Sequence, residues 1–346
     1  GPAAPAAPAR AGVTAALVIP NHNGRRWIAG CLDSVHAQTR APDEVVVVDN
    51  GSTDGSGALA AARDGVRVVS LGRNLGFAAA ANRGIAETTA DAVALVNTDV
   101  VLAEDWLERV TGALDEGVGS VASKMVSLDD PAVLYDAGDV LRRDGVCEQR
   151  GRFARDDGRF DAPGEVFAAC AGAALYRRSA VEEVGGFDER FFLYLEDVDL
   201  GLRLRLAGWS CRWEPRAVAR HAGEGSAGPR SPAHWAQRNT LLLGAKAFPA
   251  RWAGPFLYRQ GAWAWHAARE GRLREHLRAS AAAIPLLPAM LRERRRLRAA
   301  AAVPISRVVP RRPYRGPVAA DHPRARDAAP PAGGQDGVLP DAGGDG

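Results

Sequence analysis

The chain has 346 residues, 47% hydrophobic and 25% charged, enough for a sizeable core in one large domain or two ordinary ones. Its formal net charge is only +3, so the composition gives no indication of nucleic-acid binding. The four cysteines form no C-x-x-C pair, which argues against a zinc site or a disulfide framework and favours a reducing, cytoplasmic compartment. No segment reaches the roughly 18 apolar residues of a membrane helix.

Strand and helix patterns alternate through the first hundred or so residues. Short apolar runs predict strands at 13–20, 44–49, 66–70 and 92–96, and the first two are expected to be buried. Apolar residues at helical spacing predict helices at 25–37, 52–63 and 77–88, and Ser52 or Thr53 is the expected cap of the second. Such alternation predicts a doubly wound α/β sheet.

The pattern is less regular farther along the chain. We expect helices at 104–114 and 179–184, and strands at 119–124, 133–140, 166–176 and 210–214. From His234 onward the pattern is helical, amphipathic and basic. Both ends are rich in Pro, Ala and Gly, which predicts disordered tails at 1–12 and 317–346.

The segment 191–208, FFLYLEDVDLGLRLRLAG, sets Glu196 and Asp197 at the start of a helical pattern. A carboxylate held there beneath an apolar lid of Phe191, Phe192 and Tyr194 is a candidate general base, because burying an acid is costly unless it is paired or used. The alternative is that these acids, with Asp199, only complement the helix dipole in the first turn.

Polar residues also follow two of the predicted strands. Asp49 ends a buried strand and opens a Gly- and Ser-rich loop, where it is placed to bind a base or ribose. Asp99, in Asn97-Thr98-Asp99, suits a divalent cation, which prefers oxygen ligands and shares them with phosphates. Ordinary turn and cap chemistry explains either motif alone. His221, in a glycine-flanked loop, is a further candidate for a metal or phosphate, although a lone histidine is more often structural.

The order of these motifs resembles the family 2 glycosyltransferases, which have the GT-A fold. The matching stretches are VVVVDNGSTDGS (45–56), RNLGFAAAANRGI (73–85), LVNTDV (95–100), 172–209 and RHAGEGS (220–226). The resemblance implies a Rossmann-like mixed sheet flanked by helices, forming a GT-A domain over 13–240, followed by an Arg-rich helical region over 241–316.

The resemblance also implies how a nucleotide-sugar donor is bound. Asp49 is similar to the acid that contacts the nucleobase or ribose, and Arg73 would reach the base or diphosphate. The loop after the first strand, with Pro20, His22 and Asn23, would line the nucleotide pocket. Asn97 and Thr98 would also contact the donor. Asn97 replaces the first Asp of the family's D-x-D and brings no charge, so it is not expected to bind the metal.

The resemblance implies metal-binding or catalytic roles for four residues. Asp99 would bind Mg²⁺ or Mn²⁺, and His221 is similar to a histidine that joins the metal in some members. Asp197 would be the catalytic base, with Glu196 shaping its electrostatics or holding the acceptor. A single displacement by an acceptor hydroxyl would invert the anomeric configuration.

Relatives with this pattern and an Arg-rich tail resemble rhamnosyltransferases that use dTDP-L-rhamnose. The resemblance therefore implies transfer of L-rhamnose from dTDP-L-rhamnose, and more broadly a dTDP- or UDP-sugar donor. The expected acceptor is a glycan or a polyprenyl-diphosphate-linked glycan. Arginines near Trp252, Trp263 and Trp265 favour peripheral contact with the inner face of the plasma membrane. Packing of these tryptophans onto the catalytic domain is an equal alternative. We also consider a homodimer.

Two other functions are alternatives to glycosyl transfer. A sugar nucleotidyltransferase would use a similar sheet, but the first loop, Pro20-Asn21-His22-Asn23-Gly24, has no lysine. A non-catalytic sugar-nucleotide-binding protein would not need both Asp99 and Asp197.

Overall fold

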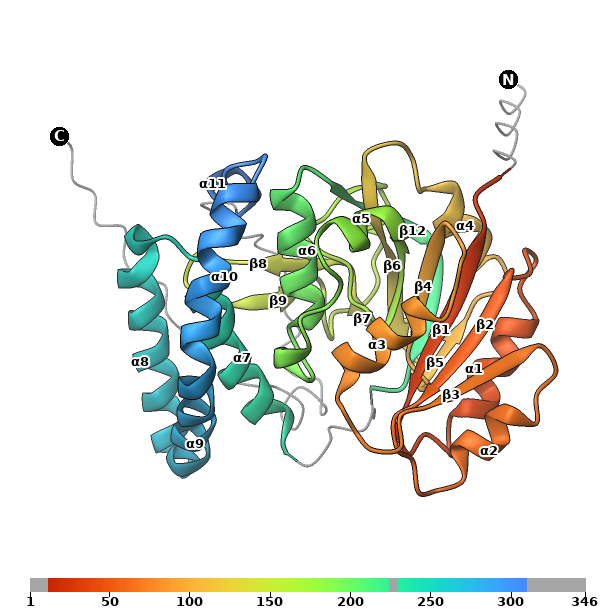
Figure 1. Cartoon of the computed structure of the whole chain (residues 1–346), viewed down its shortest axis with the longest axis horizontal. Coiled ribbons are helices and arrows are strands. Elements are labelled where there is room, and N and C mark those ends of the chain that lie inside the picture. The colour runs from red at the N-terminus through yellow and green to blue at the C-terminus, as the bar shows by residue number, and fades with distance from the viewer. Residues whose placement is uncertain (1–11, 224–229, 310–346) are drawn as a thin grey trace.

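The computed structural model describes residues 12–223 and 230–309 (Figure 1). Strand and helix alternate through its first hundred residues, as the sequence predicts. The strands are β1 (Ala15–Asn21), β2 (Glu44–Asp49), β3 (Val66–Ser70) and β4 (Ala92–Val96), and the helices are α1 (Ile28–His36), α2 (Ser56–Ala61) and α3 (Phe77–Ala86). The four strands pair in parallel in the order β4-β1-β2-β3, so their carboxyl ends meet at one edge of the sheet.

The rest of the sheet is mixed. Its order is β10-β12-β6-β11-β4-β1-β2-β3, with β5 beside β12 and β7 beside β6, making ten strands. The added strands are β5 (Val100–Leu102), β6 (Val118–Ser127), β7 (Leu134–Asp136), β10 (Gly164–Glu165), β11 (Ala173–Arg177) and β12 (Ser210–His221). β11 runs antiparallel to both β4 and β6, which joins the parallel half to the later strands. The predicted mixed α/β architecture is therefore confirmed.

Several predicted bounds are wrong. The expected strand at 133–140 is two short strands, β7 and β8 (Asp139–Leu141), because Gly138 turns the chain with φ +95° and packs against Val166. β8 pairs with β9 (Cys147–Gln149) in a separate two-stranded sheet. The strand expected at 166–176 begins only at Ala173, and the one expected at 210–214 extends to His221. The expected cap at Ser52 or Thr53 is instead Gly55, which is left-handed at φ +83°.

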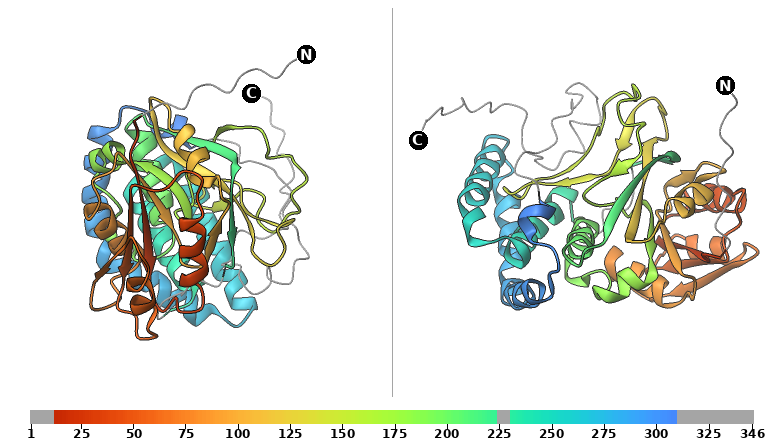
Figure 2. Two further views of the ribbon diagram at one scale, coloured as in Figure 1. Left: turned by 90° about the vertical axis from the view of Figure 1, so that its right-hand side faces the viewer. Right: turned by 90° about the horizontal axis from the view of Figure 1, so that it is seen from above.

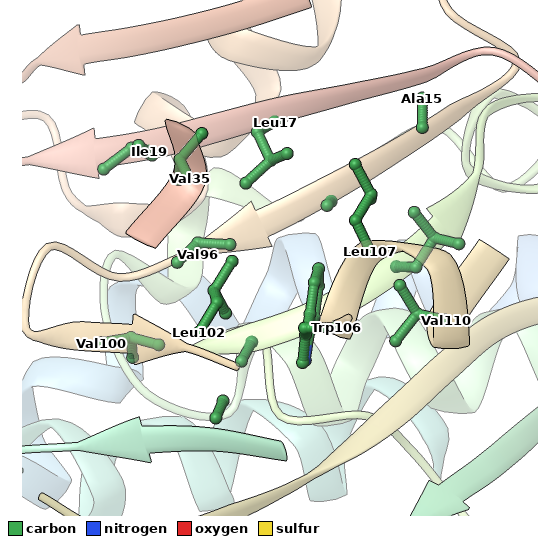
Figure 3. Packing of buried hydrophobic residues seen from close by; sticks show 14 of the residues in the cluster. Ala15, Leu17, Ile19, Val35, Val96, Val100, Leu102, Trp106, Leu107 and Val110 are labelled. Carbon is green, nitrogen blue, oxygen red and sulfur yellow. The ribbon is translucent and has the colours of Figure 1, made fainter. Parts of the chain in front are cut away.

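Helices cover both faces of the sheet. On one face α1 and α4 (Trp106–Gly112) enclose a core in which Leu17, Leu102 and Trp106 are buried (Figure 3). On the other face α3, α5 (Arg178–Glu183) and α6 (Glu196–Leu206) pack over residues such as Val18 and Leu95. Burial on both faces explains the continuous apolar runs of β1, β2 and β4.

The packing of α3 depends on one glycine, which gives a testable prediction. A Cβ on Gly84 would lie 2.1 Å from Val18 Cγ1, so we expect Gly84→Ala to lower the free energy of unfolding by about 1–3 kcal/mol. Gly30 in α1 has open space around it, so Gly30→Ala is the matched control and should stabilise by up to about 1 kcal/mol. Thermal unfolding of the two variants measures both effects; equal shifts in the same direction would contradict the packing argument.

The C-terminal helices lie at the end of the molecule farthest from β3 (Figures 1 and 2). They are α7 (Pro232–Ala247), α8 (Ala253–Arg269), α9 (Leu273–Ala283), α10 (Leu287–Ala300) and α11 (Ile305–Val308), with 3-10 turns at Ala250–Trp252 and Ile284–Leu286. A further 3-10 turn, Glu189–Phe191, precedes α6. A third core, with Leu202, Leu242 and Met290, joins α6 to α7 and α10. Among the described residues, none of the helices is both long and apolar enough to cross a membrane.

The predicted division at residue 240 stays a prediction; α7 runs through that position. Of the predicted tails, residues 1–11 and 317–346 lie outside the described residues, and Gly12 is described. The last three residues of the RHAGEGS stretch, 224–226, lie outside them as well.

Candidate active site

The loop after β1 is held against the loop after β2 by Asn21, a residue that the sequence analysis did not select. The Asn21 side chain is fully buried, and its Nδ2 donates hydrogen bonds to Asp49 Oδ1 at 3.1 Å and Ser56 Oγ at 2.9 Å. Its position at a strand end was the available signal, because the last residues of parallel strands meet at one edge. Asn21 thereby orients Asp49, the predicted nucleotide ligand.

Several other predicted donor residues lie in the same place. Pro20 pairs with Val48 across β1 and β2. His22 Nδ1 lies 3.0 Å from Asn50 O, and Asn23 Oδ1 accepts a 2.8 Å hydrogen bond from Thr53 N. The two loops after β1 and β2 thus form one hydrogen-bonded unit.

Arg73 is exposed and lies on the loop before α3, beside the loops after β1 and β2. A Cβ on Gly51 would lie 2.5 Å from Arg73 Cα, so the loop after β2 packs directly on the Arg73 backbone. Gly51 has φ +75°, a conformation that glycine adopts without strain. The close approach brings Arg73 to the carboxyl edge of the sheet with Asp49.

Asp99 and His221 form a buried pair. His221 Nε2 lies 3.1 Å from Asp99 Oδ1, and the two residues are 6% and 2% exposed. The pairing of β5 with β12 sets this contact, because His221 stands opposite Val100 and Ala222 N donates to Asp99 O at 3.0 Å. Two residues 122 positions apart are therefore brought together by a strand pairing.

The Asp99–His221 pair could supply two of the ligands of a divalent cation. Its carboxylate oxygen and imidazole nitrogen are ordinary ligands for Mn²⁺, and His221 Nδ1 is buried without a hydrogen-bond partner among the described residues. Within residues 12–223 and 230–309 no three His, Cys, Asp or Glu side chains are grouped to hold a metal by themselves. A cation here would need oxygens from a bound substrate, as Mg²⁺ in phosphate sites does.

Glu196 and Asp197 begin α6, as the sequence predicts. Asp197 Oδ2 accepts a 3.1 Å hydrogen bond from Ala171 N, and its Oδ1 accepts one of 2.8 Å from Val198 N. Loss of hydration raises the pKa of Asp197, and these backbone N–H groups oppose that shift. Burial, and then the charge of Asp197, raise the pKa of Glu196 well above its ordinary value. The environment thus favours a protonated Glu196 beside Asp197.

A short segment before β11 connects the two groups of predicted residues. Asn97 N donates a 2.9 Å hydrogen bond to Gly172 O, and the neighbouring Ala171 N donates to Asp197 Oδ2. The turn that carries Asp99 and the start of α6 are thus held by adjacent peptide groups. Thr98 faces the loop after β1, since a Cβ on Gly24 would lie 3.1 Å from Thr98 Oγ1.

Two further buried acids, Asp136 and Asp139, were missed by the sequence analysis. They are 1% and 5% exposed and lie on β7 and β8. Burial raises the pKa of Asp136 to about 7, and burial with the charges of Asp136 and Asp197 raises that of Asp139 well above its ordinary value. In the sequence both residues fall within the single strand predicted at 133–140, and nothing in that pattern marked them as candidate site residues.

The Asp136 shift predicts how stability depends on pH. Because the folded pKa of about 7 lies above the ordinary value near ~3.9, Asp136 stabilises the fold at low pH, and this contribution is lost as pH rises toward 7. Asp136→Asn cannot ionise, so we expect it to raise the Tm relative to the unmodified chain at about pH 8 but not at about pH 4. Thermal unfolding at both values tests this; a Tm difference independent of pH would contradict it.

The loop before α6 has an unusual backbone that α7 holds in place. Phe192, Tyr194 and Leu195 have φ between 65° and 66° although none is glycine. The fully buried Asn239 donates from Nδ2 to Phe191 O, Leu193 O and Tyr194 O at 2.9, 2.9 and 2.6 Å. Helix α7 therefore holds the loop that leads to Glu196 and Asp197.

The predicted apolar lid over these acids is only partly correct. Phe191 is fully buried in the core beneath the loop, Phe192 stacks on Trp235 with ring centroids 4.6 Å apart, and Tyr194 is 37% exposed. Tyr194 is thus the most exposed of the three, although more than half of its surface is covered.

Removing the Asn239 side chain should act on this loop. We expect Asn239→Ala to lower kcat by about 10- to 100-fold with little change in donor KM, because misplacing a catalytic group affects turnover more than binding. The variant should also lose about 1–3 kcal/mol of stability, since buried carbonyls lose their donor. Gly84→Ala is the control for stability alone, because it lies in α3 and should leave kcat of the folded enzyme intact. An equal kcat loss in both variants would contradict a positioning role.

Asp199 differs from Asp197 in its contacts, which bears on the alternative that the acids at the start of α6 only complement the helix dipole. It is fully buried, and its carboxylate contacts Arg203 Nε at 2.8 Å and Lys246 Nζ at 2.7 Å. Lys246 also contacts Asp188 at 2.7 Å. Asp199 is therefore structural and joins α6 to α7, whereas Asp197 forms no ion pair with a lysine or arginine in the part of the chain that the structure describes.

Comparison with family models agrees with this arrangement. The model described as glycosyl transferase family 2 matches residues 16–185, and the one described as glycosyl transferase family group 2 matches residues 149–291. Together they extend over the sheet, the start of α6 and the C-terminal helices as far as α10.

Named relatives were found in bacteria. The N-acetylglucosaminyl-diphospho-decaprenol L-rhamnosyltransferase of Mycobacterium tuberculosis is 32% identical over 250 residues, covering 65% of this chain and 81% of the relative. The pre-mycofactocin glycosyltransferase of that organism is 33% identical over 230 residues, covering 64% of this chain and 44% of the relative. The O-antigen chain rhamnosyltransferase RfbN of Salmonella typhimurium is 25% identical over 218 residues, covering 60% and 65%.

A solved structure supports the fold. The crystal structure of GalNAc-T7 with UDP, GalNAc and Mn²⁺ superposes with a TM-score of 0.58 at 14% identity, covering 73% of this chain and 51% of that one. At such identity the likeness concerns the fold alone, which is GT-A. Taken with the rhamnosyltransferase relative, of which this chain covers 81%, the family matches show that the chain is a glycosyltransferase and belongs to glycosyl transferase family 2.

Proposed function

We propose that the protein transfers L-rhamnose from dTDP-L-rhamnose to a hydroxyl of a glycan or lipid-linked glycan, with inversion and with a divalent cation. The observation that carries this proposal is the joint attachment of the Asn97–Asp99 turn and Asp197 to the adjacent peptide groups of residues 171 and 172. A donor diphosphate near Asp99 and an acceptor hydroxyl near Asp197 would then be neighbours. The family assignment favours glycosyl transfer over nucleotidyl transfer and over a purely binding role.

The choice of donor and acceptor is supported by the relatives. Two of them are named as rhamnosyltransferases, and one name specifies an N-acetylglucosaminyl-diphospho-decaprenol acceptor. We extend both to this chain as proposals. A homodimer and a cytoplasmic location remain predictions from the sequence.

In the proposed reaction Asp197 accepts the proton of the acceptor hydroxyl as that oxygen bonds to the anomeric carbon and the bond to the diphosphate breaks. Its two backbone hydrogen bonds hold the carboxylate in one orientation. Asp99 and His221 would hold the cation, which when bound neutralises the charge that develops on the departing diphosphate. Asp49, with the loops after β1 and β2, would bind the nucleoside.

The direct experiment incubates the full chain with dTDP-L-rhamnose, a synthetic N-acetylglucosaminyl-diphospho-polyprenol and Mg²⁺ or Mn²⁺. We expect release of dTDP and a product heavier by one deoxyhexose, with an anomeric configuration opposite to that of the donor by NMR. Parallel reactions with UDP- and GDP-sugars test the nucleotide. Turnover of one of those donors but not dTDP-L-rhamnose would refute the rhamnosyl assignment, and pyrophosphate release would support a nucleotidyltransferase instead.

A further inference from the structure

The C-terminal helices carry exposed apolar side chains on the faces that point away from the rest of the molecule. α9 and α10 both pack against α7, through buried residues such as Ala279 and Met290. On their outer sides Leu277 is 54% exposed and Leu291 48%, and Ile284, at the turn between the two helices, is 62% exposed. Large apolar side chains with this exposure, recurring every seventh residue, need an explanation beyond the fold.

Arginines accompany these apolar residues. Arg274 and Arg278 flank Leu277 on the outer face of α9, and Arg292 and Arg295 follow Leu291 on α10; all four are exposed. From 273 to 300, all described, no exposed position is acidic. Glu275 and Glu293 are partly buried, and they contact Ser231 and Arg296. We call Arg274, Leu277, Arg278, Ile284, Leu291, Arg292 and Arg295 the basic apolar surface.

The three tryptophans of the C-terminal region differ in their exposure to solvent. Trp252 and Trp263 are 3% and 7% exposed, so they pack inside, and only Trp265 on α8 is exposed, at 68%. Leu257 and Tyr258 on α8 are exposed as well, at 66% and 65%. An exposed aromatic and apolar face thus lies on the helix that contacts α9.

We propose that the basic apolar surface binds the surface of an anionic phospholipid bilayer. Apolar side chains between arginines are the pattern of helices that lie in the interface, where leucines enter the acyl boundary and arginines meet lipid phosphates. The helices would lie on the membrane, since among those described none is suited to span it. This inference goes beyond the reaction proposed above and does not depend on it.

Charge distinguishes a bilayer from a second copy of the chain as the occupant. In a symmetric dimer through these faces, arginines of one copy would meet arginines of the other, because the faces expose no acid. Like charges across an interface are unfavourable, whereas lipid phosphates complement them. The absence of exposed acids therefore favours the lipid.

The test is co-sedimentation of the full chain with vesicles of phosphatidylglycerol and phosphatidylcholine in equal parts, against phosphatidylcholine alone. We expect binding to the anionic vesicles only, lost in about 1 M salt, where the Debye length is about 3 Å. The quadruple variant Arg274→Gln, Arg278→Gln, Arg292→Gln and Arg295→Gln should bind on the order of 10³-fold more weakly, since each arginine near the surface contributes about five-fold. The triple variant Leu277→Ser, Ile284→Ser and Leu291→Ser should also weaken binding.

The control variants are Arg67→Gln with Arg83→Gln, and Leu59→Ser, which remove exposed arginines and an exposed leucine from the GT-A part of the chain. They should bind vesicles as the unmodified chain does. Equal binding by the quadruple variant, or a dimer in solution that the triple variant dissociates, would overturn the proposal. Turnover with a water-soluble acceptor should be unchanged in every variant, so failure of vesicle binding would be distinguishable from failure of the proposed reaction.

Discussion

The Asp197→Asn variant is expected to lose turnover by about 10²–10⁴-fold, the usual contribution of a general base, while donor affinity stays within a few-fold of the original. The amide keeps the size of the side chain but cannot accept the acceptor's proton. The carboxylate accepts hydrogen bonds from Ala171 N and Val198 N, and the amide oxygen can keep one of them. Steady-state kcat with saturating donor, and dTDP binding by calorimetry, measure the two quantities separately.

The pH profile gives a second readout of the same residue. Burial raises the pKa of Asp197, and a base must be deprotonated to act, so kcat should fall as pH drops through a value above the ordinary ~3.9 of aspartate. The pKa of the neighbouring Glu196 is also raised, by burial and then by the charge of Asp197, so this limb reports the titration of the pair. Retention of full turnover by Asp197→Asn would remove this residue from the role, whatever the shape of the profile.

The Asp99→Ala variant is expected to lose most metal-dependent donor binding. Asp99 supplies the buried carboxylate beside His221, and without it a cation would keep only the imidazole and the substrate oxygens. Calorimetric titration of dTDP with and without Mn²⁺ should show a large enhancement by metal in the unmodified chain and little in the variant. Treatment of the unmodified chain with EDTA should lower donor affinity to the level of Asp99→Ala.

Two variants around Asp99 sharpen this test. His221→Gln should show an intermediate loss of metal dependence, because one proposed ligand remains. Asn97→Ala is the control: it lies in the same turn but carries no charge, so metal dependence should persist even if donor affinity falls. A metal titration of Asp99→Ala that matches the unmodified chain would contradict the assignment.

Local patterns were sufficient for the parallel half of the sheet. Four consecutive valines in β2 and the short apolar runs of β1 and β4 are buried between helices, and β3, at the edge of the sheet, is partly buried, so each run carried its own signal. Strand–helix alternation then requires parallel strands with their carboxyl ends at one edge, which is why Asp49 and Asp99 were found at strand ends. The Glu196-Asp197 pair at a helix start was likewise visible, because helix starts have a local sequence pattern.

The tertiary structure alone decided which of these residues lie in contact. The Asp99–His221 contact depends on the pairing of β5 with β12 over 122 positions, and no local pattern encodes a partner so distant. Asn239 supports the loop before Asp197 from a helix that begins after that loop, and Asp136 is buried because β7 pairs with β6. Sequence thus determined the elements and the chemical types at their ends, since those follow from nearest neighbours along the chain. Burial, ion pairing and pKa follow from neighbours in space, and only folding supplies them.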